Sequence, residues 1–358
     1  MNYNYKYIRE IHKILNRIKI SPEVFRKALE TGDSRALGKL LLPLENCLRN
    51  QAPKKLFRIR SVTENNIEAF ENNSIYLSSA DRFNDPFDCL LFFDEEGLRK
   101  RIRSQLTKEN MINFLESVYD FTSGTSCNFE INEELFSGYE VEKELFLDKT
   151  QAKFQMITET LKKSTFISAF TSVINSPIMW SHYGDNHKGF ALEYSFDNNI
   201  FVPSRYNVIN ADYLWYGWRS LLPVIYTEKR ADATDLAEWL SFCDAISNAY
   251  KFDGKLHDLC GTLPDFLLKT KLSLKKAKEW HYEREWRLIL TVEWPNEVND
   301  ESASFEIEPT AVFLGNAMST EDRNRIISVA KNKSITIYEM FIDHSSYEYI
   351  MNYKEVVV

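Results

Sequence analysis

The residues with the clearest chemical potential lie in a late segment, residues 283–287, that reads Glu-Arg-Glu-Trp-Arg. Side chains of a strand alternate between two faces, so Glu283, Glu285 and Arg287 are expected to share one face. Two neighbouring acids need partners, and a salt-bridge network with Arg58, Arg60 or Arg287 would supply them without any chemistry. Alternatively, a carboxylate here stabilises positive charge that develops on a sugar carbon, or polarises a hydroxyl group.

A second segment, residues 179–190, contains two of the six histidines of the chain. His182 and His187 are five positions apart, so they do not share a helical face as metal ligands at i and i+4 would, and we recognise no zinc motif in their spacing. Hydrogen-bonded structural histidines explain the pair without any ligand. Because the same turn carries Trp180 and Tyr183, it also suits stacking on a nucleotide base.

A third segment, residues 82–88, reads Arg-Phe-Asn-Asp-Pro-Phe-Asp and follows an expected strand. Asn84 and Asp85 before Pro86 are typical of a turn, because their side chains bond the nearby backbone and proline keeps the preceding residue extended. The acids then shape the loop. The functional interpretation is that Asp85 or Asp88 faces a cleft.

The hydrophobic periodicity predicts the elements that position these segments. Strands are expected at 55–62, 74–79, 165–173, 189–196, 221–227, 286–292, 304–307, 311–314 and 335–342. Helices are expected at 8–18, 37–48, 63–72, 98–106, 109–121, 141–161, 234–250, 264–278 and 319–331. This order predicts an α+β core with a mixed sheet at 53–345, a helical N-terminal extension at 1–52, a helical insertion at about 96–163 and a C-terminal tail at 346–358.

Composition limits the function classes. Lys plus Arg total 44 against 52 Asp plus Glu, which argues against a surface that attracts nucleic acid as a whole. The five cysteines are scattered and form no CxxC pair, so neither a disulfide framework nor a zinc ribbon is expected. No basic head precedes an apolar run and no stretch approaches about 18 apolar residues. We therefore expect a cytoplasmic protein without membrane contact.

The three segments, together with Phe-Arg-Ile-Arg-Ser at 57–61, occur in the order seen in a bacterial family of unknown function. The chain resembles this family over residues 54–341, and four ordered motifs make a chance match improbable. It departs from the family in its first strand, where Phe57-Arg58-Ile59-Arg60 replaces the usual Tyr-Lys-Tyr-Arg. The resemblance implies a role in bacterial stress, toxin or phage-defence systems.

The layout of these motifs is in turn similar to that of ADP-ribosyltransferases, which implies a split sheet and NAD as substrate. In that arrangement Arg58 and Arg60 would hold the pyrophosphate or a ribose, and Tyr76 would stack on nicotinamide next to Ser78. Glu285 would stabilise the oxocarbenium-like state while Glu283 orients or activates the acceptor. The remaining residues expected in the same cleft are Asn84, Asp85, His182, Tyr183, His187 and Arg287.

The resemblance thus predicts an ADP-ribosyltransferase or NAD glycohydrolase that needs no metal, with a nucleic acid or protein as acceptor. A metal-dependent nuclease or phosphohydrolase is the first alternative, with Asp85, Asp88, His182 and His187 as ligands. The second is a module that binds a nucleotide or a partner without catalysis. In each case the N-terminal helices are expected to mediate self-association or partner docking.

Overall fold

The computed structural model describes residues 5–20, 35–105, 150–196, 201–207, 214–241, 267–291 and 304–357, with isolated positions between 107 and 148 and at 265. Their centre is a ten-stranded mixed sheet with the order β16-β15-β14-β6-β1-β5-β12-β8-β7, in which β3 also pairs with β5. Its strands are β1 (Leu56–Arg60), β3 (Ser78–Ser79), β5 (Thr165–Thr171), β6 (Phe190–Tyr194), β7 (Phe201–Asn207), β8 (Leu214–Pro223), β12 (Glu285–Thr291), β14 (Ala311–Leu314), β15 (Thr336–Ile342) and β16 (Met351–Glu355). The predicted α+β class and mixed sheet are confirmed.

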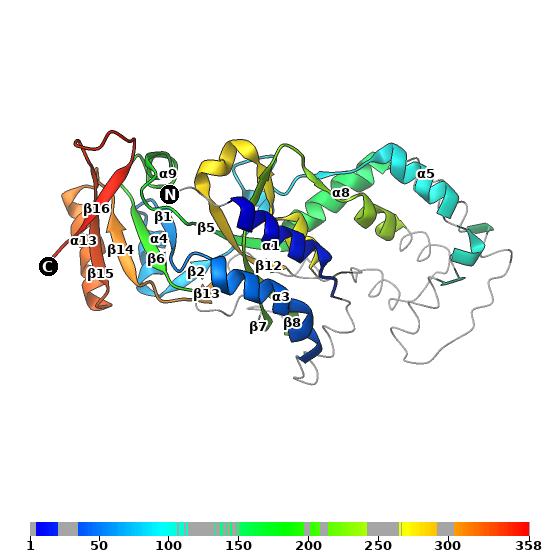
Figure 1. The fold of residues 1–358 in the computed structure, drawn as a ribbon, viewed down its shortest axis with the longest axis horizontal. Coiled ribbons are helices and arrows are strands. Elements are labelled where there is room, and N and C mark those ends of the chain that lie inside the picture. Colours follow the sequence, from blue (N-terminus) through cyan, green and yellow to red (C-terminus); the bar gives the residue numbers. More distant parts are fainter. Residues whose placement is uncertain are drawn as a thin grey trace.

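Helices and short two-stranded sheets surround this centre (Figure 1). The helices are α1 (Tyr5–Arg17), α3 (Arg35–Gln51), α4 (Glu64–Glu71), α5 (Glu95–Gln105), α8 (Thr150–Lys163), α9 (Pro177–Tyr183), α12 (Leu268–Leu272) and α13 (Thr320–Asn332), with 3-10 turns η1 (Ala80–Arg82) and η2 (Lys278–Glu283). The small sheets pair β2 (Ser74–Tyr76) with β13 (Ser304–Glu306), β4 (Leu91–Phe92) with β10 (Ala231–Asp232), and β9 (Ile225–Thr227) with β11 (Lys275–Ala277).

Both faces of the sheet are covered, and alternation along β1 decides which side chain meets which layer. Phe57 and Ile59 pack with Trp180 of α9 in one buried cluster. Leu56 faces the other side, in a larger cluster that includes residues of α1, α3, α4 and α13. Among these helices, α4 begins directly after Thr63, because the Thr63 side chain accepts a hydrogen bond from the backbone N–H of Asn66 and caps the helix.

The N-terminal helices belong to the packing of the core. Ile11 and Leu15 of α1 and Leu44 of α3 are fully buried in the larger cluster. The buried His12 ring donates from Nε2 to the carbonyl oxygen of Pro223, 2.8 Å away, at the end of β8. One face of this extension is therefore used inside the chain.

The structure differs from the sequence prediction at several elements. The helix expected at 264–278 is wrong: α12 ends at Leu272, and β11 follows because it pairs in parallel with β9. Sheet pairing over a long sequence distance thus overrides the local helical pattern. The C-terminal segment contributes β16, which pairs with β15 at the edge of the sheet. The helix expected at 109–121, the start of that at 141–161 and the end of that at 234–250 lie largely outside the described residues.

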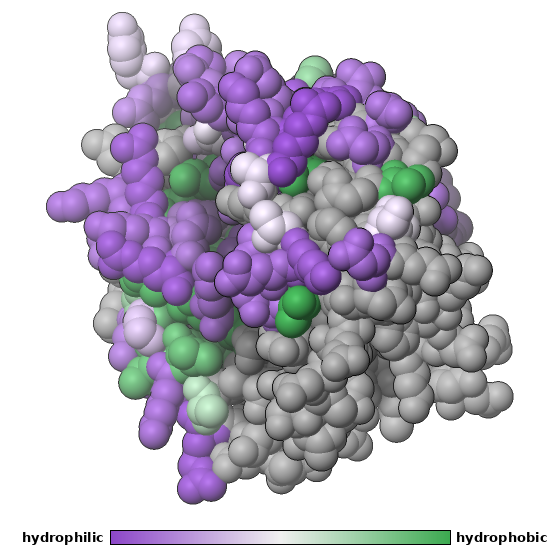
Figure 2. All heavy atoms as spheres, turned by 90° about the vertical axis from the view of Figure 1, so that its right-hand side faces the viewer, coloured by the Kyte–Doolittle hydropathy of each residue, from purple (hydrophilic) through white to green (hydrophobic). Residues whose placement is uncertain are grey.

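The long axis of the molecule separates two ends (Figure 1). The strands β14 to β16 and α13 lie at one end, and α5 and α8 lie at the other. Figure 2 shows the second end, where the described surface is mainly hydrophilic with scattered hydrophobic residues. None of the helices in the described part of the chain is long and apolar enough to cross a membrane.

The buried His12 makes the stability of the protein sensitive to acid. Burial and the nearby charge of Lys275 together lower the pKa of His12 to about 4, against the opposing effect of the hydrogen bond to Pro223. Below pH 6.5, the ordinary pKa of histidine, the unfolded chain therefore binds more protons than the folded protein. The free energy of unfolding falls as the pH drops from about 6.5 towards 4. We expect the free energy of unfolding to fall by about 2 kcal/mol more between pH 7.5 and 5 in the wild type than in His12→Gln.

Chemical denaturation at the two pH values measures this difference. His344→Gln, which changes an exposed histidine, is the matched control and is expected to keep the wild-type pH dependence. An identical pH dependence in His12→Gln and the wild type would contradict the assignment.

Candidate active site

The sheet divides at its centre, between β1 and β5. These strands share one residue pair, Phe57 with Thr171, and the ladder does not continue towards Arg60. Further along the same edge, Ser78 of β3 pairs with Ile167 of β5. On this edge of β5, residues 168–170 therefore lie between the position that pairs with β1 and the position that pairs with β3. They pair with neither of these strands in the described ladders.

A cavity of about 330 Å³ opens at this division, at the lower end of the range of small-molecule sites. Eight of the residues predicted from the sequence line it: Arg58, Arg60, Tyr76, Ser78, Asn84, Tyr183, Glu283 and Glu285. The other four predicted residues, Asp85, His182, His187 and Arg287, lie outside its lining. Asp88, which the turn motif also offered as a cleft residue, lines the cavity as well, and the structure adds Arg82, Phe83, Ser168, Thr171 and Lys276.

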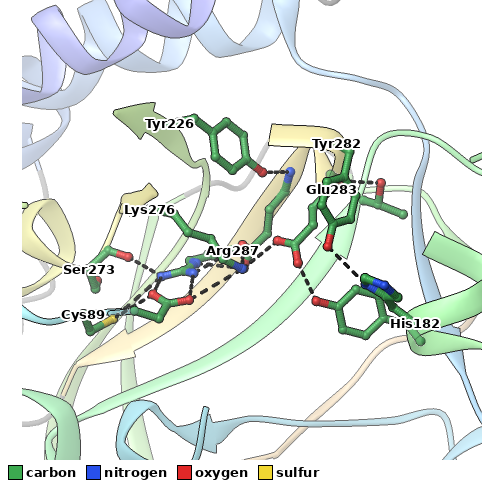
Figure 3. Close-up of polar contacts among 12 residues, drawn as sticks. Cys89, His182, Tyr226, Ser273, Lys276, Tyr282, Glu283 and Arg287 are labelled. Carbon is green, nitrogen blue, oxygen red and sulfur yellow. Dashed lines mark hydrogen bonds and ion pairs between the residues drawn. The ribbon is translucent and has the colours of Figure 1, made fainter. Parts of the chain in front are cut away.

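The acidic end of the cavity is organised by one ammonium group. Lys276 Nζ donates to Glu283 Oε2 at 2.6 Å and to Glu285 Oε2 at 3.0 Å. It also lies 5.1 Å from the centre of the Trp280 ring, within cation–π range. Glu283 makes a further short hydrogen bond with the hydroxyl group of Tyr183 on α9 (Figure 3). Two carboxylates from one chain segment thus converge on a single buried cation.

Behind this pair, Arg287 is fully buried and uses all of its donors. Its Nη1 and Nη2 atoms bind the two carboxylate oxygens of Asp88 at 2.9 and 2.5 Å. Its Nε and Nη2 atoms bind Glu285 at 2.8 and 3.2 Å, and Nη1 also donates to the carbonyl oxygen of Ser273 at 2.6 Å. Arg287 therefore positions Glu285 and the loop that carries Asp88 instead of contacting a ligand.

The pKa values of the two glutamates are shifted in opposite directions. Burial and the charge of Glu285 raise the pKa of Glu283 to about 7, against the opposing effects of Lys276 and Tyr183. Burial acts in the same direction on Glu285, but Arg287 and Lys276 outweigh it and lower its pKa to about 2. Near neutral pH, Glu285 is ionised and Glu283 is poised to exchange a proton.

The sequence prediction that Glu283, Glu285 and Arg287 share one strand face is only partly correct. Glu283 ends η2, and Arg284 adopts a left-handed conformation with φ of 45° before β12 begins at Glu285. This turn directs the Glu283 carboxylate towards Lys276, which also binds Glu285. Of the salt-bridge partners expected for the two glutamates, Arg287 binds Glu285. Lys276, which was not predicted from the sequence, binds both glutamates.

The arginines of β1 approach the cavity from the other face of the sheet. Paired residues share a face, so Glu285 lies on the side of Thr171 and Phe57, whereas Arg58 alternates to the opposite side. The guanidinium carbon of Arg58 lies 5.6 Å from the centre of the Phe170 ring. Both faces reach one cavity because β1 and β5 separate there.

Three polar atoms on this side are relevant to ligand binding. The Nε atom of Arg58 and the Oγ atom of Ser168 are buried and have no hydrogen-bond partner among the described residues. Arg58 Nη2 reaches the carbonyl oxygen of Tyr76 only at 3.5 Å. Burial lowers the pKa of Arg60, which indicates a poorly solvated guanidinium group. Unsatisfied buried donors next to a cavity are typical of a binding site.

The predicted residues outside the cavity have structural contacts. Asp85 accepts the backbone N–H of Phe87 at 2.9 Å, as its turn motif predicts. His182 is exposed and its Nδ1 atom lies 3.1 Å from the hydroxyl oxygen of Tyr282. His187 adopts φ of 68° in the turn before β6, and its backbone N–H donates to the carbonyl oxygen of Trp180. In the described part of the chain, no three His, Cys, Asp or Glu side chains form a metal-binding group.

Lys276 was missed because it lies in a run of lysines that the sequence analysis assigned to a helix. In the strand β11, Lys276 points inward while Lys275 and Ala277 are partly exposed. Lys276 can be recognised as an inward-facing residue only if residues 275–277 are known to form a strand. That strand depends on the pairing of β11 with β9, which the local sequence does not reveal. Asp88, by contrast, was already a candidate in the turn motif.

These features define an α+β protein whose central sheet divides around a cavity with a buried carboxylate pair. Residues 179–288 match the model of a family described as Protein of unknown function (DUF2971). This match covers less than half of the chain; it includes Lys276 and Glu285, whereas Arg58 and Ser78 precede it. The chain has no significant match among curated proteins or among solved structures.

Removal of Arg287 is expected to destabilise the protein strongly. Arg287→Met leaves Asp88 and Glu285 buried without their main partner, and breaking a buried ion pair from one side typically costs about 3–5 kcal/mol. Chemical denaturation measures the loss. The matched control is Arg325→Met, which breaks an exposed ion pair with Glu64 and is expected to change stability little. Equal effects of the two substitutions would contradict this account of the network.

The protonation of Glu283 can be observed directly. In protein labelled with ¹³C at the glutamate carboxyl groups, we expect one carboxyl resonance to titrate with a midpoint near 7 and to disappear in Glu283→Gln. Tyr183→Phe is expected to raise that midpoint, because the Tyr183 hydroxyl group stabilises the carboxylate form. Tyr353→Phe, in the distant edge strand β16, is the control. Glutamates that all titrate near their ordinary value of about 4.3 would refute the opposed pair.

Proposed function

We propose that this protein is an NAD-using enzyme that cleaves the bond between nicotinamide and ribose, as an ADP-ribosyltransferase or NAD glycohydrolase. The observation that carries the proposal is the pair Glu283 and Glu285, whose pKa values are shifted in opposite directions, in a cavity also lined by Arg58, whose buried Nε donor has no hydrogen-bond partner among the described residues. Glycosidic bond cleavage commonly uses two carboxylates whose environments push their pKa values apart.

The cationic side of the cavity supports an anionic donor substrate. Arg58 and Arg60 are adjacent on one face of β1, and the free Nε donor of Arg58 suits a phosphate oxygen. Ser78 and Ser168 line the same region and offer hydroxyl groups. Tyr76, which is 44% exposed, provides an accessible ring on which a planar base can stack.

The acidic side supports the chemistry at the ribose. An ionised Glu285 stabilises the positive charge that develops at the ribose carbon as neutral nicotinamide leaves with the bonding electron pair. Glu283, with a pKa near 7, takes the proton of the attacking acceptor. Arg287 and Lys276 keep Glu285 ionised during this step.

A metal-dependent nuclease has less support. Asp88 gives both carboxylate oxygens to Arg287, and His182 lies on the surface beside Tyr282. A metal ion bound by Asp88 would have to displace a bidentate guanidinium group. The non-catalytic binding module differs from the enzyme only in turnover, so the same experiment separates them.

Nicotinamide release from NAD tests the proposal. We expect release by the wild type and a loss of about 10²–10³-fold in Glu285→Gln, the scale seen when one transition-state-stabilising group is removed. Glu279→Gln changes an exposed glutamate of η2 outside the cavity and is the matched control, with activity close to the wild type. Circular dichroism must confirm that the Glu285 variant is folded.

Two outcomes would contradict the proposal in different ways. NAD that binds tightly without any nicotinamide release favours a binding module. The absence of both NAD binding and release removes NAD as the ligand altogether.

A further inference from the structure

The acidic end of the cavity carries a buried cation, Lys276, in direct contact with both glutamates. The charged residues in the cavity lining comprise four cations, Arg58, Arg60, Arg82 and Lys276, and three acids, Asp88, Glu283 and Glu285. The buried Arg287 neutralises Asp88 and Glu285 further from behind. An incoming group at this end therefore meets a site that is already compensated for negative charge.

Lys276 is fixed at the point where an acceptor would approach Glu283. Its side chain is 8% exposed, and its ammonium group contacts both glutamates while Asp88 Oδ2 lies 3.6 Å away. The pairing of β11 with β9 sets its backbone, and the Trp280 ring covers the ammonium group. Displacing this cation would leave two acids buried side by side, which is costly.

We propose that the acceptor of the ADP-ribosyl group is a neutral oxygen nucleophile, namely water or a hydroxyl group, and that Lys276 excludes cationic acceptors such as an arginine side chain. This inference rests on the function proposed above and names the acceptor class of that same site.

The reaction balances with the groups that are present. The bond between the ribose carbon and the nicotinamide nitrogen breaks, and both electrons leave with nicotinamide. A lone pair of the acceptor oxygen forms the new C–O bond, and the hydroxyl proton passes to the Glu283 carboxylate. A guanidinium acceptor would instead have to lose a proton before its nitrogen could attack, and guanidinium is a very weak acid. A hydroxyl group, by contrast, releases its proton easily once its oxygen begins to form the new bond.

Competition between two acceptors of similar length tests the inference. The full chain is incubated with NAD and equal concentrations of agmatine, which carries a guanidinium group, and butane-1,4-diol, which is neutral. Mass spectrometry measures the two ADP-ribosyl adducts together with ADP-ribose. In the wild type we expect the diol adduct to exceed the agmatine adduct by at least about tenfold, as repulsion between like charges at close range implies.

Lys276→Met should raise the ratio of agmatine adduct to diol adduct by about tenfold or more, because it removes the repelling charge but keeps the volume. The ratio compares two products of one enzyme, so it is independent of any loss of overall rate. Lys278→Met is the matched control, since this lysine is 57% exposed, pairs with Glu228 at 2.6 Å and lies outside the cavity. It should leave the ratio unchanged.

The outcomes separate the inference from the proposed function. Wild-type protein that modifies agmatine as readily as the diol overturns the inference and leaves NAD cleavage intact. An unchanged ratio in a folded Lys276→Met variant overturns the role of Lys276. If the variant does not fold, the wild-type ratio decides alone. No nicotinamide release from the wild type with either acceptor overturns the proposed function, and the acceptor inference with it.

Discussion

The buried guanidinium group of Arg287 is the interaction on which the site depends. It connects Asp88, in the loop after β3, to Glu285, at the start of β12, and so fixes two segments that are distant in the sequence. A fully buried cation is tolerated only when each donor has a partner, and Arg287 meets this condition. Its contact with Glu285 helps to keep that carboxylate ionised, whereas Glu283 has no direct contact with Arg287 and has a pKa near 7.

The division of the sheet is the second constraint. A continuous ladder between β1 and β5 would keep the arginines of β1 and the glutamate of β12 on opposite faces, separated by backbone. Because the two strands share only the pair of Phe57 and Thr171, side chains of both faces reach one cavity. Hydrophobic clusters pack against both faces of β1, so the cavity lies next to the hydrophobic core.

The distribution of charge makes the two sides of the cavity chemically different. Arg58, with an unsatisfied Nε donor, and Arg60 lie at one side, and the acid cluster that Lys276 and Arg287 bind lies at the other. Such a gradient suits a ligand with an anionic part and a polar, neutral part. Lys276 is central to this distribution, since it keeps two close carboxylates compatible and at the same time reduces their attraction for a further cation.

Local patterns in the sequence were enough to predict the α+β class and most strands of the central sheet, because alternating and helical periodicity reports local burial. Eight residues of the cavity lining were predicted from their motifs, several of them, such as Arg58 and Tyr76, only through the resemblance to ADP-ribosyltransferases. Tertiary structure decided the rest. The strand β11 exists because it pairs with β9, and only that pairing turns Lys276 inward from a run of lysines that is otherwise typical of a solvated helix. Likewise, the roles of Glu283 and Glu285 differ because of partners from distant segments, Tyr183 for one and Arg287 for the other, and no local pattern encodes which charges meet across a folded core.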